Sequence, residues 1–402
     1  MPYSVMHDFP VSEFHDRVRR TREAMAADGL DLLLAWSDSY RMSNVRWLSN
    51  YRAFDGVFPY PAMVALPLKG EPILFAEGSL VSTAVGWTWM SDVRGIRQEL
   101  GNVLTEYAAS GDVKRIGIAG YKYLAAEFLD TIRGAVPDTI EVGRTRILDY
   151  LKSIKSEIEI RNMKVAGRLA DIGIEAVRLN AYEGVTEREL VRAAYTSMFA
   201  NGADTASFDI MVQTGENSAN YFLARPTDRK LQRGDTILID MGCRYNGYSS
   251  DMARGVAFGE VSADAQRMLD TCLEAWESGM KALRPGMTGA EADVAANEVL
   301  SAAGYTHDSG EGRGCAHGTG MDPEEEVPVI GPGSEWVLTV NQSFAFEITL
   351  LIPGVGGTRI EDTVILRSDG PESLTNYRYT NAWDWVARPN TFPAIAGGEE
   401  RR

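Results

Sequence analysis

The pattern of hydrophobic and polar positions in the first third of the chain changes its period several times, and each period predicts a different element. Residues 12–27 repeat with helical spacing, and the helix should stop at Asp28-Gly29 because glycine commonly ends helices. The uninterrupted apolar run over 30–36 is typical of a buried strand. Two further strands and a helix are expected at 62–66, 72–75 and 124–134. Helices and strands mixed in this way predict an α/β domain.

The rest of the chain predicts long helices separated by strands with turn signals between them. Helices are expected over 157–179 and 261–283. Thr186 and Thr288 each begin a Thr-x-x-Glu sequence, the capping box that starts a helix, so two more helices should follow them. The chain as a whole is therefore predicted to be α/β (α+β), with two domains.

One hairpin is predicted at Asn246-Gly247, which lies between β-prone residues and is the strongest short hairpin signal a sequence offers. Pairing outward from this turn places Asp240 opposite Ala253. Asp251 then becomes a diagonal neighbour of Asp240, roughly 7–8 Å away at Cα and on the same face. Asp240 follows an apolar run over 237–239, where an unpaired buried carboxylate would be costly.

A second hairpin, centred on Gly354, should repeat this arrangement. Glu347 and Glu361 lie symmetrically about that turn, so they should face each other across the ladder and project from the same face of the sheet. Four carboxylates from two hairpins repel one another unless a positive charge lies between them, and divalent cations commonly supply it. His317, in a glycine-rich stretch that would let the backbone approach a metal, is the remaining candidate ligand.

The order and spacing of these residues resemble the pita-bread metallohydrolases, a family that includes methionine aminopeptidase, aminopeptidase P, prolidase and creatinase. The resemblance implies two divalent metal ions (Mn, Co, Zn or Fe), with Asp251 and Glu361 bridging them. It implies five ligands: Asp240, Asp251, His317, Glu347 and Glu361. It also implies a creatinase/prolidase-like N-terminal domain over 1–153, a pita-bread catalytic domain over 154–402, and a homodimer.

The chain departs from the peptidases of this family near the implied metal centre. Those peptidases usually carry a His where this chain has Phe222-Leu223, and another seven residues after the ligand His, where this chain has Glu324. Glu347 is followed by Ile348 instead of the usual Pro. The chain has only 4 histidines, so no residue nearby in sequence replaces the missing pair. The resemblance therefore implies an intact metal centre with a changed substrate pocket.

Glu347, Arg359 and Glu324 are the candidate catalytic and substrate-binding residues. Glu347 is a ligand whose free oxygen could reach a metal-activated water, so it is the candidate general base and later proton donor. Arg359 precedes Glu361 by two residues on the same face, where it could hold a substrate carboxylate or form a structural ion pair with the acidic cluster. Glu324 could face the pocket and favour a cationic substrate group, or belong to a solvated charge run over 322–326.

Composition narrows the class of protein. The 402 residues, 45% of them hydrophobic, suffice for two domains. A net charge of −16 argues against nucleic-acid binding, which requires a basic face, and no apolar run approaches the ~20 residues of a membrane span. The start of the chain lacks the basic and apolar regions of a secretory signal, and the 3 cysteines lack metal-type spacing. A cytoplasmic enzyme with reduced thiols is expected.

We expect a metal-dependent hydrolase of a C–N bond. The intact ligand set and Arg359 support an Xaa-Pro dipeptidase or aminopeptidase with a dipeptide substrate. The missing His pair and Glu324 support a hydrolase of a small non-peptide amide or amidine, of the creatinase or ectoine-hydrolase type. A non-catalytic binding protein is disfavoured, because such relatives tend to lose ligands. The aromatic segment from residue 376 could pack at the pocket mouth, pack across a subunit boundary or dock loosely.

Overall fold

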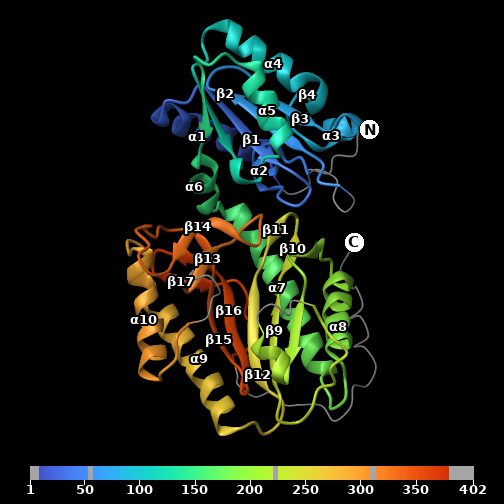
Figure 1. The fold of residues 1–402 in the computed structure, drawn as a ribbon, viewed down its shortest axis with the longest axis vertical. Coiled ribbons are helices and arrows are strands. Elements are labelled where there is room, and N and C mark those ends of the chain that lie inside the picture. Colours follow the sequence, from blue (N-terminus) through green and yellow to red (C-terminus); the bar gives the residue numbers. More distant parts are fainter. Residues whose placement is uncertain (1–8, 53–57, 221–224, 308–313, 380–402) are drawn as a thin grey trace. The chain divides into compact units, whose positions relative to one another are not determined.

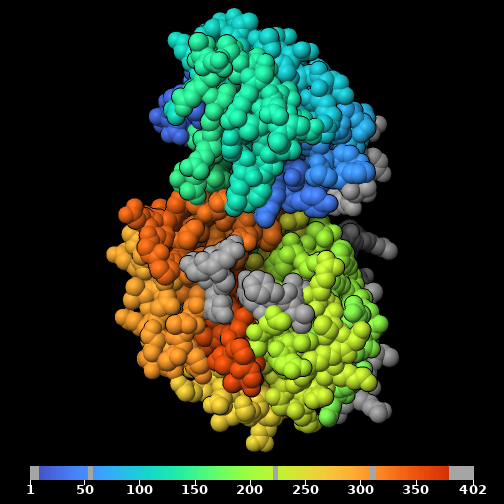
Figure 2. Space-filling view, viewed as in Figure 1, coloured from blue at the N-terminus to red at the C-terminus, as the bar shows by residue number. Residues whose placement is uncertain are grey.

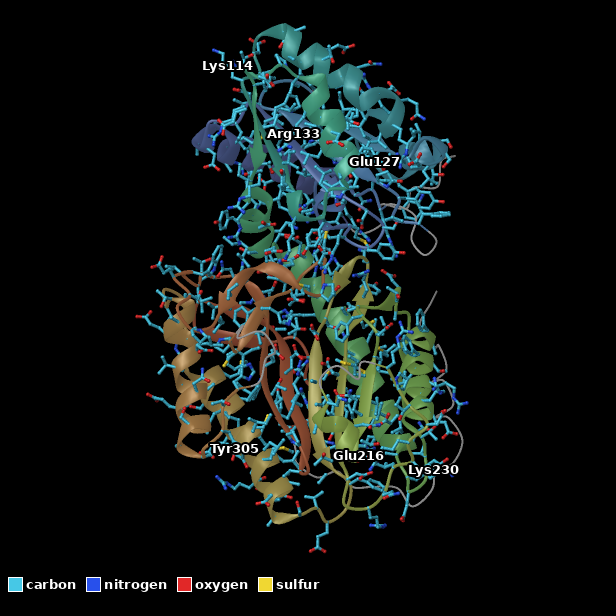
Figure 3. The ribbon with its side chains drawn as sticks, viewed as in Figure 1. Lys114, Glu127, Arg133, Glu216, Lys230 and Tyr305 are labelled. Carbon is cyan, nitrogen blue, oxygen red and sulfur yellow. The ribbon has the colours of Figure 1, made fainter. Side chains whose placement is uncertain are left out.

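The computed structural model describes residues 9–52, 58–220, 225–307 and 314–379. The chain divides into two units, Met1–Lys152 and Ser153–Arg402, each with its own sheet and helices (Figure 1). Side chains fill the space between the helices and the sheets in both units (Figure 3). No helix in the described part of the chain is long and apolar enough to cross a membrane.

The first unit is built on a six-stranded mixed sheet. Its strands are β1 (Leu32–Ser37), β2 (Ala62–Pro67), β3 (Ile73–Ala76), β4 (Asp92–Gly95), β5 (Arg115–Ala119) and β6 (Glu141–Arg144). They are ordered β4-β3-β2-β1-β5-β6, with β1 antiparallel to β2 and parallel to β5. Every residue of β1 is buried, which confirms the strand predicted from the apolar run.

The first unit also contains helices. They are α1 (Val11–Asp28), α2 (Ser43–Ser49), α3 (Val81–Trp87), α4 (Ile96–Ser110), α5 (Ala126–Ala135) and α6 (Ile147–Ser153), with short 3₁₀ turns η1 (Gly78–Leu80) and η2 (Tyr121–Tyr123). α1 ends at Gly29 as predicted, because this residue has a φ of 67° and its N–H bonds the carbonyl of Ala26. Leu100 and Leu104 of α4 and Ile132 of α5 pack in the core of the sheet.

The second unit contains a large sheet and a small one. The strands are β7 (Thr205–Ala206), β8 (Met211–Thr214), β9 (Thr236–Met241), β10 (Cys243–Tyr245), β11 (Tyr248–Ser249), β12 (Met252–Ala257), β13 (Ala316–Gly318), β14 (Glu325–Ile330), β15 (Ser343–Ile352), β16 (Gly356–Arg367) and β17 (Gly370–Ser373). The large sheet is ordered β14-β13-β15-β16-β12-β9-β8, and β17 also pairs with β16. The small sheet is ordered β11-β10-β7.

Two helix pairs pack against the large sheet. The helices are α7 (Glu157–Asn180), α8 (Glu187–Ala200), α9 (Ala263–Ala282) and α10 (Gly289–Ala302), and η3 (Gly215–Ala219) is a 3₁₀ turn. The core under α7 and α8 includes residues of β8, β9 and β12, and the core under α9 and α10 includes residues of β13, β15 and β16. In the space-filling view, residues of the β15–β16 region (red) reach the surface between the orange and yellow-green parts (Figure 2).

Capping boxes begin three of these helices. Those predicted at Thr186 and Thr288 are confirmed, since each hydroxyl accepts a hydrogen bond from the N–H of the glutamate three residues later. Ser156 and Glu159 form a third, which starts α7. These caps therefore set the residues at which the three helices begin.

Candidate metal centre

Two glutamates face each other on the hairpin formed by β15 and β16. Glu347 is paired directly with Glu361, as predicted. The hairpin closes with Ile352 opposite Gly356, and Gly354 in the turn has a φ of 81°, which favours glycine. Both glutamates are buried, so their carboxylates are largely removed from water.

A third carboxylate is in register with this pair. Asp240 on β9 is opposite Ala253 on β12, as predicted, and Ala253 is in turn opposite Glu361. Asp240, Ala253, Glu361 and Glu347 therefore form one row across four adjacent strands. Residues in one row point to the same face of a sheet, so the three carboxylates share a face although they are far apart in sequence.

Asp251 lies immediately before β12. The Asn246-Gly247 turn is confirmed, because β10 pairs with β11 and both turn residues have positive φ. The hairpin is not continuous, however, since β10 and β11 join β7 in the small sheet while β9 and β12 belong to the large one. Asp251 is held at this change of sheet by the hydroxyl of Thr363, which accepts from its N–H at 2.7 Å and donates to its carbonyl at 2.8 Å.

His317 brings an imidazole to the same place. It lies on β13 opposite Ala345, two residues from Glu347 on the same face of β15. Its Nε2 atom is 3.8 Å from Oδ2 of Asp251 and 3.7 Å from Oε1 of Glu361. One ligand atom from each of Asp251, His317 and Glu361 lies within 4.8 Å of the others, a spacing that can hold a metal ion.

Two buried carboxylate oxygens of this cluster lack a hydrogen-bond partner among the described residues: Oδ1 of Asp240 and Oε2 of Glu361. A buried acceptor left unsatisfied costs free energy, and a bound cation would satisfy both atoms. Carboxylate oxygens together with an imidazole nitrogen suit hard and borderline divalent ions. The donor set therefore fits a divalent metal centre.

Burial and mutual repulsion separate the acidities of these groups. Burial raises the pKa of Asp240 to about 7, with Arg359 opposing the rise. Burial and the neighbouring Glu361 raise the pKa of Asp251 well above its ordinary value, and burial and Glu347 raise that of Glu361. For Glu347, burial also acts to raise the pKa, but Arg359, His317 and His307 together outweigh burial and lower the pKa. Glu347 is therefore the carboxylate that ionises most readily.

Arg359 lies inside the acidic cluster. Its Nη1 atom donates a hydrogen bond to Oδ2 of Asp240. Its Nε atom donates to Oγ1 of Thr349 at 2.8 Å and lies 3.2 Å from Oε2 of Glu347. Arg359 thus forms an ion pair with the acidic cluster, and the binding of a substrate carboxylate by Arg359 stays a prediction.

The acidic run over 322–326, one alternative for which was a solvated charge run, is solvated only in part. Glu324 is exposed. Asp322 is buried, and its Oδ1 atom has no hydrogen-bond partner in the described ranges. Glu325 forms an ion pair of 2.9 Å with Lys155, and both side chains are buried. The sequence offers no periodic signal for this difference, because the run passes from a turn into β14.

His307 lies beside the ligand strand, which the sequence did not predict. Its Nδ1 atom accepts a hydrogen bond from the N–H of Thr349 at 3.1 Å, and its Nε2 atom is 2.8 Å from the carbonyl oxygen of Gly314. Thr349 follows Glu347 by two residues, so the ring supports this part of β15. No motif connects His307 with the ligands, and only the tertiary structure reveals the contact.

The described start of the aromatic C-terminal segment packs on its own unit. Tyr377 is buried, and the ring of Tyr379 lies 4.5 Å from that of Trp276 on α9. The rest of this segment, with Trp383 and Trp385, lies outside the described residues, as does Phe222-Leu223.

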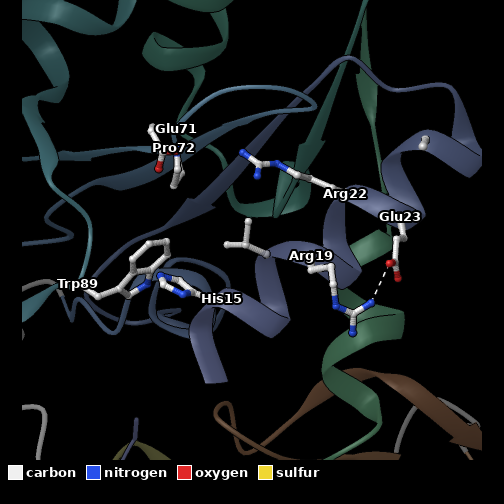
Figure 4. Close-up of a pocket in the computed structure, with 9 residues that line it drawn as sticks. His15, Arg19, Arg22, Glu23, Glu71, Pro72 and Trp89 are labelled. Atoms are coloured by element: carbon white, nitrogen blue, oxygen red, sulfur yellow. Dashed lines mark hydrogen bonds and ion pairs between the residues drawn. The ribbon is translucent and has the colours of Figure 1, made fainter. Parts of the chain in front are cut away.

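A cavity of about 550 Å³ in the first unit has a different character (Figure 4). It is lined by α1 and by Trp89, whose ring contacts that of His15. Arg19 forms an ion pair with Glu23, and Arg22 donates to two backbone carbonyls. Both guanidinium groups thus already have partners within the protein, and the described residues that line the cavity include no cluster of buried carboxylates. The candidate metal centre is therefore in the second unit.

Comparison with known proteins gives two family matches. Residues 161–368 match metallopeptidase family M24, and residues 17–149 match the creatinase/prolidase N-terminal domain. An uncharacterized peptidase of Staphylococcus aureus is 31% identical over 346 residues, which cover 83% of this chain and 92% of the relative.

Solved structures of similar fold cover both units. An Xaa-Pro dipeptidase from Bacillus anthracis has a TM-score of 0.79 and 26% identity, covering 92% of this chain and 99% of its own. Dipeptidase PepE from Mycobacterium ulcerans has a TM-score of 0.80 and 25% identity, covering 93% of this chain and 100% of its own. An X-Pro aminopeptidase from Thermotoga maritima has a TM-score of 0.78 and 25% identity, covering 92% and 99%.

The fold and the family matches together define a metal-dependent hydrolase of the pita-bread class. The chain belongs to metallopeptidase family M24 and carries a creatinase/prolidase N-terminal domain. The fold class, the family and the enzyme class predicted from the sequence are thus confirmed.

Proposed function

We propose that this chain hydrolyses the C–N bond of an Xaa-Pro dipeptide or peptide, with two divalent ions held by five residues: Asp240, Asp251, His317, Glu347 and Glu361. The observation that carries this proposal is the row of three buried carboxylates, beside which His317 and Asp251 approach Glu361. The names of similar structures, an Xaa-Pro dipeptidase and an X-Pro aminopeptidase, support the choice of bond.

Glu347 is the proposed general base. Two bound divalent ions would lower the pKa of a water molecule and polarise the substrate carbonyl. The Arg359 guanidinium lowers the pKa of Glu347, so its carboxylate is ionised at neutral pH and can accept a proton. The same carboxyl group can then return the proton to the leaving nitrogen.

Arg359 is proposed to orient two of the ligands. Its guanidinium contacts Asp240 through Nη1 and Glu347 through Nε, so the two carboxylates are fixed relative to each other. Since these donors are already engaged, we favour this positioning role over the binding of a substrate carboxylate. Asp251 and Glu361, both within 4 Å of His317, are the proposed bridging ligands.

A second candidate function is hydrolysis of a small non-peptide amide or amidine. Glu324 stands where the peptidases carry a His, and buried Asp322 lies two residues before it with an unpartnered oxygen within the described ranges. Negative charge at this position would oppose the charge that develops on a peptide carbonyl, and it would attract a cationic group. This candidate therefore predicts a cationic substrate.

An assay of the metal-reconstituted enzyme against Xaa-Pro dipeptides and small cationic amides separates the two functions. The first predicts cleavage of Ala-Pro or Gly-Pro with kcat/KM of about 10⁴ M⁻¹s⁻¹ or more. Faster turnover of the cationic amides, with slow dipeptide cleavage, would favour the second. Absence of any hydrolysis with Mn²⁺, Co²⁺, Zn²⁺ or Fe²⁺ would contradict both.

The metal, the assembly and the cellular compartment are further parts of the proposal. Four carboxylates and one imidazole suit manganese or cobalt better than ions that require thiolates, so these two should restore activity best. We also expect a homodimer, which light scattering tests, and a cytoplasmic location, which cell fractionation tests.

A further inference from the structure

The chain after β17 runs behind the candidate metal centre. Asp362 follows Glu361 on β16, and adjacent residues of a strand point to opposite faces of the sheet. The carboxylate of Asp362 is therefore on the face opposite to the ligand carboxylates. Thr375 donates a hydrogen bond to Oδ1 of Asp362 at 2.5 Å, which places residues 374–379 on this rear face. We refer to residues 374–379 as the rear segment.

Arg254 connects the rear segment to the strand that carries Glu361. Its side chain is 1% exposed and donates to the carbonyl of Glu361 at 2.8 Å and to Oδ1 of Asp362 at 2.9 Å. It also donates to the carbonyl of Tyr377 from Nη2 at 2.7 Å and from Nε at 3.2 Å. The ring of Tyr379 covers the guanidinium at 4.5 Å. One buried cation thus joins the ligand strand to two residues of the rear segment.

Thr363 makes a second, separate connection. Its hydroxyl holds both the N–H and the carbonyl of Asp251. Its own backbone is held by the rear segment, since the N–H of Thr363 donates to Oγ1 of Thr375 at 3.2 Å and its carbonyl accepts from the N–H of Leu374 at 2.7 Å. Thr363 therefore links the rear segment to the backbone of Asp251, and Arg254 links it to the backbone of Glu361. These two residues carry the carboxylates nearest His317.

The rear segment is itself anchored to α7. Asp171 accepts hydrogen bonds from the N–H groups of Asn376 and Tyr377, and the Tyr377 hydroxyl donates to Glu175. Gly167 lies so close to the rear segment that an added Cβ would stand 2.2 Å from the carbonyl oxygen of Leu374. The segment is therefore fixed on one side by a long helix and on the other by the ligand strands.

We propose that the rear segment is a brace for the metal centre, with Arg254, Thr363 and Thr375 as positioning residues that set the spacing of Asp251 and Glu361. This inference rests on the proposed function, because it requires that these two carboxylates bind metal. Outer residues that orient metal ligands commonly affect metal affinity 10- to 100-fold. Loss of the brace should therefore weaken metal binding in a protein that is still folded.

Thr375→Val tests the brace, and Tyr377→Phe is its matched control. Valine keeps the size of the buried threonine but removes the hydroxyl that contacts Asp362 and Thr363. Phenylalanine removes the hydroxyl that donates to Glu175 on α7 and keeps the carbonyl that Arg254 binds. Both variants act on the rear segment, but only the first acts on the ligand strands.

The measurement is calorimetric titration of the metal-free full-length proteins with MnCl₂, together with the visible spectrum of the Co²⁺-loaded proteins. The brace predicts that Thr375→Val raises the Kd of at least one ion by about tenfold or more and changes the Co²⁺ bands. Thr375→Ser, which keeps the hydroxyl, should restore both, and Tyr377→Phe should leave both unchanged. Arg254→Lys should also raise the Kd, because lysine cannot reach the separate acceptors that the guanidinium holds.

Three results would overturn the inference. Thr375→Val and Arg254→Lys could bind Mn²⁺ as tightly as the unmodified protein. Alternatively, Thr375→Val and Tyr377→Phe could weaken binding equally and lower the melting temperature equally, which would show a general loss of stability. If the unmodified protein itself binds no Mn²⁺, the proposed metal centre fails and the brace fails with it, so the two failures can be told apart.

Discussion

Glu347 lies directly opposite Glu361 in the β15–β16 ladder, yet the two carboxyl groups differ in acidity. Burial and the neighbouring Glu347 raise the pKa of Glu361, whereas Arg359, His317 and His307 together lower the pKa of Glu347 against the effect of burial. Neighbouring carboxyl groups with separated pKa values are typical of sites that divide ligand and proton-transfer roles. The difference in environment supports Glu347 as the proton acceptor and Glu361 as a ligand.

Replacement of Glu347 by Gln tests this division. Gln keeps the shape of the side chain but cannot accept a proton, so turnover should fall by at least ~10²-fold, the low end for loss of a general base. Steady-state assays and elemental analysis of the same preparation check both effects. A Glu347→Gln enzyme with full metal content and near-normal turnover would place the base elsewhere.

Glu324→His tests the changed substrate pocket. Removing the negative charge and supplying an imidazole should raise kcat/KM for Xaa-Pro dipeptides. Because Glu324 is exposed, its charge is screened, and the change should correspond to no more than ~1 kcal/mol. Glu326→His, also at an exposed acidic position, is the control. If the Glu324→His variant and the unmodified enzyme cleave the dipeptides equally well, Glu324 does not act in the substrate pocket.

The buried ion pair between Lys155 and Glu325 should matter more for stability than an exposed one. Lys155→Met leaves the Glu325 carboxylate buried without its cation, and breaking a buried pair in this way costs about 3–5 kcal/mol. Lys164→Met breaks an ion pair with Glu372 that is more than a third exposed, and should cost no more than ~1 kcal/mol. Urea titrations of both variants measure the difference, and similar midpoints would contradict it.

The pKa of Asp171 should make the stability of the protein depend on pH. Burial raises the pKa of this carboxyl to about 6, although two backbone N–H groups of the rear segment oppose the rise. A raised carboxyl pKa means that the folded protein binds this proton more tightly than the unfolded chain does. The stabilising contribution is therefore complete below the unfolded pKa of about 3.9 and is lost as pH rises through about 6.

The uncharged Asp171→Asn variant cannot show this loss. Its stability relative to the unmodified protein should therefore rise between pH 5 and pH 8, which urea titrations at the two pH values measure. A stability difference that stays constant between these pH values would show that Asp171 does not titrate in this range.

Much of the fold and part of the site could be predicted because they depend on local signals. The Asn246-Gly247 turn and the turn at Gly354 each fix the register of a ladder, and register alone places Asp240 opposite Ala253 and Glu347 opposite Glu361. The capping boxes likewise act within one turn of helix.

Other features depend on contacts between distant segments, which no local pattern records. The position of Asp251 follows from the change of sheet and from Thr363, and the place of His307 follows from its bond with Thr349. Glu325 is buried because Lys155 reaches it from the start of α7. The two alternatives for Arg359 could not be separated from the sequence, since they differ only in which carboxylate the guanidinium meets.

The most direct test of the account is the number of metal ions bound per chain, measured by elemental analysis after dialysis against Mn²⁺ and then against metal-free buffer. The unmodified chain should bind about two ions, as in two-metal hydrolase sites, and His317→Ala and Glu361→Gln should bind fewer. His15→Ala, in the first unit, should bind as many ions as the unmodified chain. An unmodified chain without bound metal, or ligand variants with the same metal content as the unmodified chain, would contradict the account.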